Sequence, residues 1–399
     1  MAGSVSGIGT TFDLPNYHGE LFSLTPSDTP LLSAIGGLTG GGSTTATKFE
    51  WQTYDLRDPQ QRTRVEGAPA PGAENRVRAK VENVLQIHQE KVSVSYTKQA
   101  ATGQYATPQS APFTSAAGAE NPVSSELDWQ VEQALKQIAL DVNYSFINGR
   151  MVDATTNAEA RKTAGLLSVA KTNAVNKGTA ITGSAATDTI TATHSLSNGD
   201  VVIFTDAGGS TAVVEGRRYY VVAKATGTFK VAAKPGGDPI TLGTIAELEV
   251  VVPAATELAV DTVDEFTQLV FDNGGLTGGL GTFIVNSSQK RALTKAYANA
   301  YGKTAPIRSE KVGGVNVTQI ENDFGVLNIM LDRHVPQDAI ILASLDQLRP
   351  VFLNIPGKGV FFEEELAKTG ASTDVQIYGE IGLEYGNELA HGVLRGLKV

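Results

Sequence analysis

The chain has 399 residues, a formal net charge of −10 and 42 glycines, and 19% of its residues are charged, which allows two or three domains rich in turns and extended segments. The absence of cysteine excludes disulfide scaffolds, thiolate zinc sites and cysteine nucleophiles. The acidic balance argues against a protein that wraps nucleic acid, because neutralising phosphates requires an excess of lysine and arginine.

Residues 1–47 are low in charge and rich in Gly, Ser and Thr, with two apolar stretches at 12–17 and 29–35 that we expect to be extended. A segment of this composition has too little apolar surface to fold by itself. We therefore expect a neighbouring subunit to hold this arm, and Phe12 and Tyr17 are its candidate contact residues.

Residues 48–96 have the pattern of one very long β-hairpin. Phe49 and Trp51 share a face of the outgoing strand, and the prolines in 58–72 end both limbs, since proline cannot donate to a strand ladder. The apolar residues of the return strand change from odd to even positions, which predicts a bulge or twist near Gln89. An isolated ribbon is only marginally stable. We therefore expect a neighbouring molecule to cover its apolar face, with Trp51 as a candidate contact.

Charges of both signs alternate along this hairpin. The candidate inter-subunit residues among them are Arg57, Arg62, Arg64 and Glu66. Mixed signs fit ion pairs across a subunit interface. An ordinary solvated surface explains the same pattern equally well.

The clearest helix is predicted at 125–147. Apolar residues recur there every three or four positions, at Leu127, Val131, Leu135, Ile138, Val142 and Phe146. The pattern indicates a long helix with one buried stripe. A domain's longest core helix would look the same.

Residues 174–257 change to short apolar runs separated by turn sequences. We predict strands at 189–193, 201–205, 219–222, 229–232 and 247–252. Strands at such spacing are typical of a small all-β module, which we interpret as an insertion.

A mixed texture resumes after this module. We predict helices at 262–272 and 288–301 and a strand at 283–285. From Val375 onward, apolar Ile377 and Ile381 alternate with polar Gln376 and Glu380, which predicts a half-buried strand. Outside the β module, the chain is therefore expected to be an α+β protein.

The sequence contains only weak matches to the motifs of catalytic and ligand-binding sites. Gly302-Lys303-Thr304 lacks the upstream glycine of a phosphate-binding loop, and the five histidines form no ligand pair. The acidic run after Phe361 is typical of a solvated loop; Phe361 and Glu363 are candidate contact residues. No apolar run approaches the roughly 20 residues of a membrane span. We predict a protein without catalytic, metal or cofactor sites and without a membrane partner.

The order of several motifs resembles the tailed-phage major capsid proteins of the Hong Kong 97 fold. They are Phe12-Asp13-Leu14-Pro15-Asn16-Tyr17, Thr29-Pro30-Leu31-Leu32, the long hairpin, the long helix, Thr163-Ala164-Gly165-Leu166, Phe283-Ile284-Val285-Asn286 with Gln289-Lys290-Arg291, and Phe361-Phe362-Glu363 through Lys368-Thr369-Gly370. The resemblance covers the whole chain except the β module.

The resemblance implies a domain map. It places an N-terminal arm at 1–47, an extended loop at 48–98, a peripheral domain with a spine helix at 99–173, an inserted β-rich domain at 174–257, an axial domain at 258–345 and a segment returning to the peripheral domain at 346–399.

The resemblance also implies a function. Identical subunits would form the pentamers and hexamers of an icosahedral-type shell, assembled in the host bacterial cytoplasm around phage double-stranded DNA that is enclosed without specific binding. The implied partners are a portal protein, a separate scaffolding protein and possible decoration proteins. The alternative is a virion or cell-surface binding protein with a sugar-binding β module, and a hydrolase is a distant third.

Overall fold

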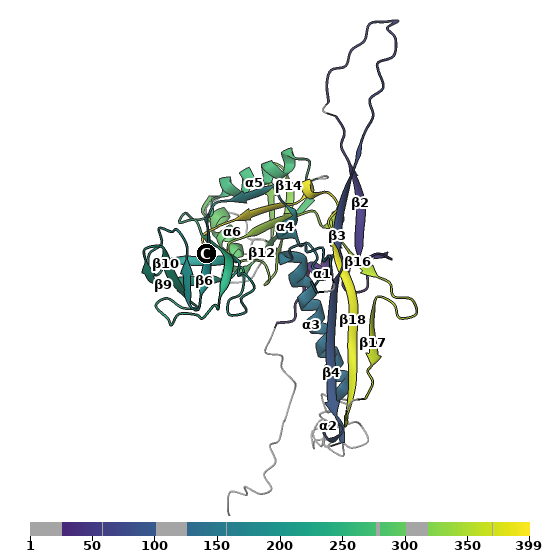
Figure 1. The fold of residues 1–399 in the computed structure, drawn as a ribbon. Coiled ribbons are helices and arrows are strands. Elements are labelled where there is room, and N and C mark those ends of the chain that lie inside the picture. The colour runs from purple at the N-terminus through teal and green to yellow at the C-terminus, as the bar shows by residue number, and fades with distance from the viewer. Residues whose placement is uncertain are drawn as a thin grey trace, which may run out of the picture. The chain divides into compact units, whose positions relative to one another are not determined.

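The computed structural model describes residues 26–57, 59–100, 126–156, 158–276, 280–300, 318–368 and 370–399. The chain divides into two compact units (Figure 1). The first comprises Met1–Ser27, Gln89–Ile138 and Phe362–Tyr378, and the second comprises Asp28–His88, Ala139–Phe361 and Gly379–Val399. Helices and strands both occur in the described residues, as the mixed sequence pattern predicts.

The hairpin is shorter than its sequence suggests. Strand β2 (Lys48–Tyr54) pairs with β3 (Arg78–Val84), and the described residues of 55–77, here called the hairpin tip, lie outside any strand. The return limb breaks at Leu85, and β4 (Gln86–Ser95) then pairs with a different strand, β18. Ile87 is exposed while His88 is buried, so the change of face occurs between Leu85 and Ile87, a little before the bulge or twist predicted near Gln89.

A five-stranded sheet surrounds the longest strand, β18 (Ser372–Glu384). Its other members are β1 (Gly42–Thr44), β16 (Arg349–Leu353), β17 (Phe361–Glu365) and β4, in the order β1-β16-β18-β17 with β4 also on β18. The odd positions of β18 are buried, which confirms the predicted strand. Glu380, expected on the polar face, is buried as well, because Arg161 pairs with it at 2.9 Å.

The long helix is confirmed as α3 (Glu126–Asn148). Ile138, Val142 and Phe146 are buried, whereas Leu135 of the predicted stripe is 38% exposed. Two short helices flank it in the sequence, α2 (Tyr96–Ala100) and α4 (Leu166–Val169).

Residues 30–34 form a short helix, α1 (Pro30–Ala34), where the sequence suggested an extended segment. Proline suits the first turn of a helix, because its missing N–H has no intrahelical acceptor there. Leu31 and Leu32 are buried, and the Leu32 amide donates to Asn143 Oδ1 at 3.0 Å. The described part of the expected arm is therefore held by its own chain.

The second unit contains a six-stranded sheet. Its order is β13 (Gln319–Asn322), β14 (Gly325–Leu331), β12 (Leu280–Val285), β15 (Ile340–Ala343), β19 (Gly392–Arg395) and β5 (Ala174–Asn176). Helices α5 (Val260–Asp272) and α6 (Ser287–Ala300) contribute Phe266 and Leu293 to its core. Because β19 joins this sheet while β18 joins the other, residues 346–399 supply strands to both sheets. Two 3-10 turns, Leu345–Gln347 and Glu388–Ala390, precede β16 and β19.

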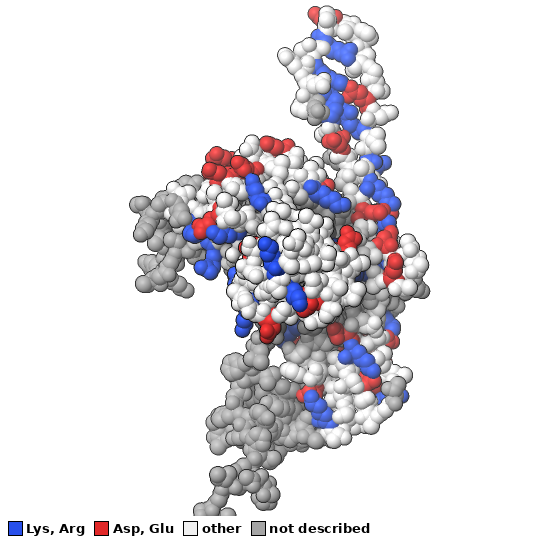
Figure 2. Space-filling model, turned by 60° about the vertical axis from the view of Figure 1, so that its left-hand side comes forward, with Lys and Arg blue, Asp and Glu red and all other residues white. Residues whose placement is uncertain are grey.

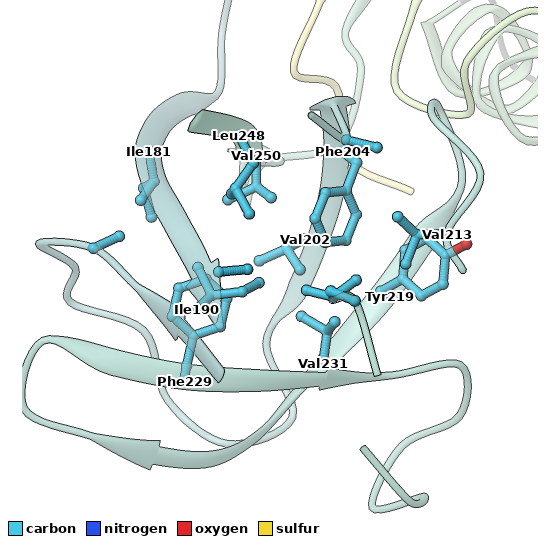
Figure 3. Close-up of a cluster of buried hydrophobic side chains, with 14 of the residues drawn as sticks. Ile181, Ile190, Val202, Phe204, Val213, Tyr219, Phe229, Val231, Leu248 and Val250 are labelled. Atoms are coloured by element: carbon cyan, nitrogen blue, oxygen red, sulfur yellow. The ribbon is translucent and has the colours of Figure 1, made fainter. Parts of the chain in front are cut away.

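Residues 179–252 form a closed barrel, which includes all five strands predicted there. Its order is β10 (Thr228–Ala232), β7 (Thr189–Thr191), β6 (Thr179–Ala186), β11 (Ile245–Val252), β8 (Val201–Asp206) and β9 (Arg218–Ala225). Phe204, Phe229 and Val250 point into an interior filled by apolar side chains (Figure 3). Strand β6 was missed by the sequence analysis because its residues are mostly small and polar.

Candidate functional site

The base of the hairpin is packed on its own chain. Phe49 is buried with Leu85 and Val351. Trp51 Nε1 donates to the Gly386 carbonyl at 2.7 Å, and its ring meets Tyr385 edge-on at 4.7 Å. Trp51, a candidate inter-subunit contact in the sequence, is therefore engaged within the subunit.

Ion pairs bridge the two strands at the base. Lys48 Nζ lies 2.8 Å from both Glu82 Oε1 and Asp153 Oδ2, and Lys80 pairs with Glu50. Hydrogen bonds from these carboxylates raise the pKa of Lys48, with the Asp153 carboxylate making the largest contribution. This arrangement holds β2 and β3 in register, and it leaves the tip to extend beyond them.

No described part of the chain covers the apolar side chains of the hairpin tip. Figure 1 shows it as two segments that continue beyond β2 and β3. Every described residue from 54 to 80 is exposed, including Tyr54 at 72%, Leu56 at 66%, Val65 at 82% and Val77 at 80%. Large apolar side chains at such exposure, gathered on one ribbon, are typical of an interaction surface.

The charges of the tip are partly paired inside the chain, and both signs are visible along it in Figure 2. Glu74 accepts ion pairs from Arg57 at 3.4 Å, from Arg76 at 3.3 Å and from Arg62. The Arg62 hydrogen bond is the main cause that holds the pKa of Glu74 below its usual value. Arg64 donates to the Pro69 carbonyl at 3.4 Å. Three guanidinium groups thus surround one carboxylate, while the tip as a whole is balanced, with four arginines and four acidic residues over 55–77.

The remaining candidate residues lie elsewhere. Glu66 is exposed at the tip, and Glu363 is exposed on β17. Phe361 meets Phe352 edge-on, with ring centroids 6.2 Å apart, so its ring packs within the chain. Phe12 and Tyr17 lie outside the described residues.

A cavity of about 250 Å³ lies where the barrel meets the six-stranded sheet. Its lining includes Asp338 and Arg395, and burial raises the pKa of the former and lowers that of the latter. Gly396 N donates to Asp338 Oδ2 at 3.2 Å, and Arg395 donates to the Leu167 carbonyl at 2.8 Å. Both groups thus support the backbone around the cavity.

A larger groove of about 690 Å³ lies beside α6, and its lining includes Lys290, of the motif order above, together with Lys295 and Lys398, which the sequence analysis did not single out. Lysines on an amphipathic helix are ordinary in a sequence, so only the fold could reveal their grouping. In the part of the chain that the structure describes, no cluster of His, Asp or Glu could hold a metal ion. No helix among the described residues is long and apolar enough to cross a membrane.

Comparisons with known proteins agree with the fold. A profile of the SU10 major capsid protein family matches residues 4–398. No curated protein sequence matches the chain. The capsid asymmetric unit of cyanophage A-1(L) is similar in structure, with 10% identity, a TM-score of 0.53 and 98% of each chain covered. The capsid of a native GTA particle is also similar, with 13% identity, a TM-score of 0.50 and 100% of each chain covered.

These capsid structures have the Hong Kong 97 fold, which confirms the fold class expected from the motif order. Since the family profile spans nearly the whole sequence, the chain belongs to the SU10 major capsid protein family and is a shell-forming capsid subunit.

Proposed function

We propose that copies of this subunit form pentamers and hexamers of an icosahedral-type shell around phage double-stranded DNA, and that the hairpin tip contacts a neighbouring subunit. The observation that carries the second part is the exposure of Leu56, Val65 and Val77 on a ribbon with no core of its own. Contact with a neighbour would remove this apolar surface from water, a favourable change.

The same proposal covers the partners of the shell. We place assembly in the host bacterial cytoplasm, with a portal protein, a separate scaffolding protein and possible decoration proteins, because the family's role implies them. The net charge of −10 fits a shell that encloses DNA without gripping it, since like charges repel. We include the domain map predicted from the sequence in this proposal, with the barrel as an inserted module.

The alternative, a sugar-binding β module, gains no support from the barrel. Its interior is filled by buried apolar residues, and neither of the two pockets described above lies inside it. A ligand site there would need an opening that the packed core does not provide.

The experiment that tests the tip contact replaces Val65 with serine. Val65 is 82% exposed, so the melting temperature of the subunit is expected to stay within about 2 °C of the parent, as for most exposed positions. Particle yield, counted by electron microscopy after expression, is expected to fall. The triple change Leu56→Ser, Val65→Ser and Val77→Ser should reduce it further.

Val214→Ser is the matched control, since Val214 is 44% exposed on the barrel. It should leave particle yield unchanged. Normal particles from the triple variant would show that the tip is not a subunit contact. A parent protein that forms neither capsomers nor particles would contradict the assembly proposal itself.

A further inference from the structure

The groove beside α6 is strongly basic. Its lining includes Lys290, Arg291, Lys295 and Lys398, which we call the basic groove. Among the described residues that line it, Glu257 is the only acidic side chain, and it lies 2.5 Å from Lys295 Nζ and 3.9 Å from Lys398 Nζ. Four cationic groups around one carboxylate leave the groove with an excess of positive charge.

Lys290 is the group that most needs a partner. Its Nζ is buried and has no hydrogen-bond partner in the described structure. Burial lowers the pKa of this amine. A buried ammonium without an acceptor is destabilising, whereas a carboxylate placed beside it forms a charge-assisted hydrogen bond. The groove therefore fits an acidic ligand.

An acidic surface lies on the same unit. We call it the acidic margin, and it consists of Asp261, Asp264, Glu265, Glu321 and Asp323. Figure 2 shows acidic side chains gathered along the upper edge of the body, at the height of α5 in Figure 1. Phe271 of α5 and Phe324 have ring centroids 5.5 Å apart, so the turn between β13 and β14 packs against the helix.

Asp264 is the counterpart of Lys290. Its Oδ1 is buried, and the side chain of Asn322 lies within hydrogen-bonding range of the carboxylate. Burial first, and then the neighbouring Asp323 and Asp261 carboxylates, raise the pKa of Asp264, while nearby Asn322 has the opposite effect. The ion pair that the structure gives this margin is a distant one, Lys177 to Glu265 at 3.8 Å. The margin therefore fits a basic partner.

The two surfaces share no residue, and Asp264 and Lys290 form no ion pair with each other within the chain. We propose that the acidic margin of one copy binds the basic groove of a second copy, so that the acidic and basic side chains of the two surfaces face each other across the contact. A contact between two different patches of identical subunits is head-to-tail, and such contacts close into rings when the rotation permits. This inference rests on the proposal that copies of the chain assemble.

The test uses charge reversal in the full-length chain. Lys290→Glu and Asp264→Lys each place like charges together across the contact, which is expected to reduce particle yield about tenfold or more. The double variant carrying both changes restores opposite charges and should recover most of the yield. Particles are counted by electron microscopy, and the melting temperature of each purified subunit is measured beside them.

Matched controls reverse exposed charges on the barrel, Lys234→Glu and Glu247→Lys. Both should assemble as the parent does. Normal particle yield from Lys290→Glu would overturn the inference, and so would a double variant that folds but is no better than the single ones. If the parent assembles in either case, the proposed function still stands.

A neutral variant decides the case if a reversal prevents folding. Lys290→Met keeps the length of the side chain and removes the unpartnered charge. The subunit should melt at the same temperature or higher, because an unsatisfied buried amine is gone, while particle yield should fall. A lower melting temperature together with a lower yield would show a structural role of Lys290 within the subunit and overturn the inference.

Discussion

The buried side chain of His88 makes the stability of the folded subunit depend on pH. It is 7% exposed on β4, its Nε2 has no partner within the described structure, and burial lowers its pKa from 6.5 to about 4. The folded subunit therefore holds His88 neutral at pH values where the unfolded chain would protonate it. The stability that depends on neutral His88 is therefore fully present above pH 6.5. It is lost as the pH falls toward 4, because the unfolded chain binds the proton first.

We expect His88→Leu to flatten this part of the stability profile. In the parent, His88 should lower the free energy of unfolding by on the order of 3 kcal/mol between pH 6.5 and 4, because each unit of pKa shift corresponds to about 1.4 kcal/mol. The measurement is urea unfolding of the subunit at several pH values, with parent and variant side by side. Equal slopes for the two proteins would contradict the assignment. His391, whose pKa burial also lowers, remains in both and supplies the residual slope.

Single residues also show where sequence reasoning reached its limit. The alternation of Phe49 and Trp51 predicted a face that needs covering, and this face is indeed covered. The covering comes from Val351, Tyr385 and Gly386, which lie some 300 residues later, and no local pattern contains that information. The exposed residues of the tip were predicted only as charges, while Leu56 and Val65 were not singled out.

At the scale of elements, the periodicity of apolar residues predicted most of the helices and strands that it is able to predict. The helices at α3, α5 and α6 and five of the six barrel strands follow from their own sequence patterns, whereas β6 was missed. The failure in the hairpin has a different cause, because the sequence of a strand does not specify which strand it pairs with. Residues 78–95 read as one limb, but β3 pairs with β2 while β4 pairs with β18.

The two ends of the barrel are joined to adjacent residues of the second unit. Lys177 N donates to the Arg395 carbonyl at 2.9 Å, and Ala254 N donates to the adjacent Gly396 carbonyl at 2.8 Å. The chain therefore enters and leaves the barrel at neighbouring points. A short linker can span such a gap without strain, since closing a short loop costs little extra entropy.

We expect replacement of residues 179–252 by a short Gly-Ser linker to leave the rest of the chain folded. Some stability should be lost, because the barrel also contributes the Gly216 carbonyl to Gln337 N at 2.8 Å and an ion pair from Asp206 to Arg150. Circular dichroism and thermal melting of the shortened chain provide the measurement. Insoluble protein, or loss of the cooperative transition, would show that the barrel is required for folding.

At the scale of the whole molecule, the fold class came from motif order rather than from any single pattern. The family's role is structural, and the function of a shell subunit depends on surfaces that meet only in the assembly. The sequence therefore indicated what kind of protein this is more readily than which residues contact a neighbour. The mixed charge of the hairpin tip, which has four arginines and four acidic residues, is the surface property that can be tested at this scale.

Arg64 is the best probe of that charge, because it donates to the Pro69 carbonyl and, unlike Arg62, forms no ion pair with a carboxylate among the described residues. Arg64→Glu should leave the melting temperature of the subunit unchanged within about 2 °C, since exposed charges contribute little to folding. Particle yield should fall, and higher salt should restore part of it by screening the new repulsion. Arg217→Glu, an exposed charge on the barrel, is the control and should have no effect on yield. A parallel loss of melting temperature and yield in Arg64→Glu would instead show that the tip stabilises its own subunit.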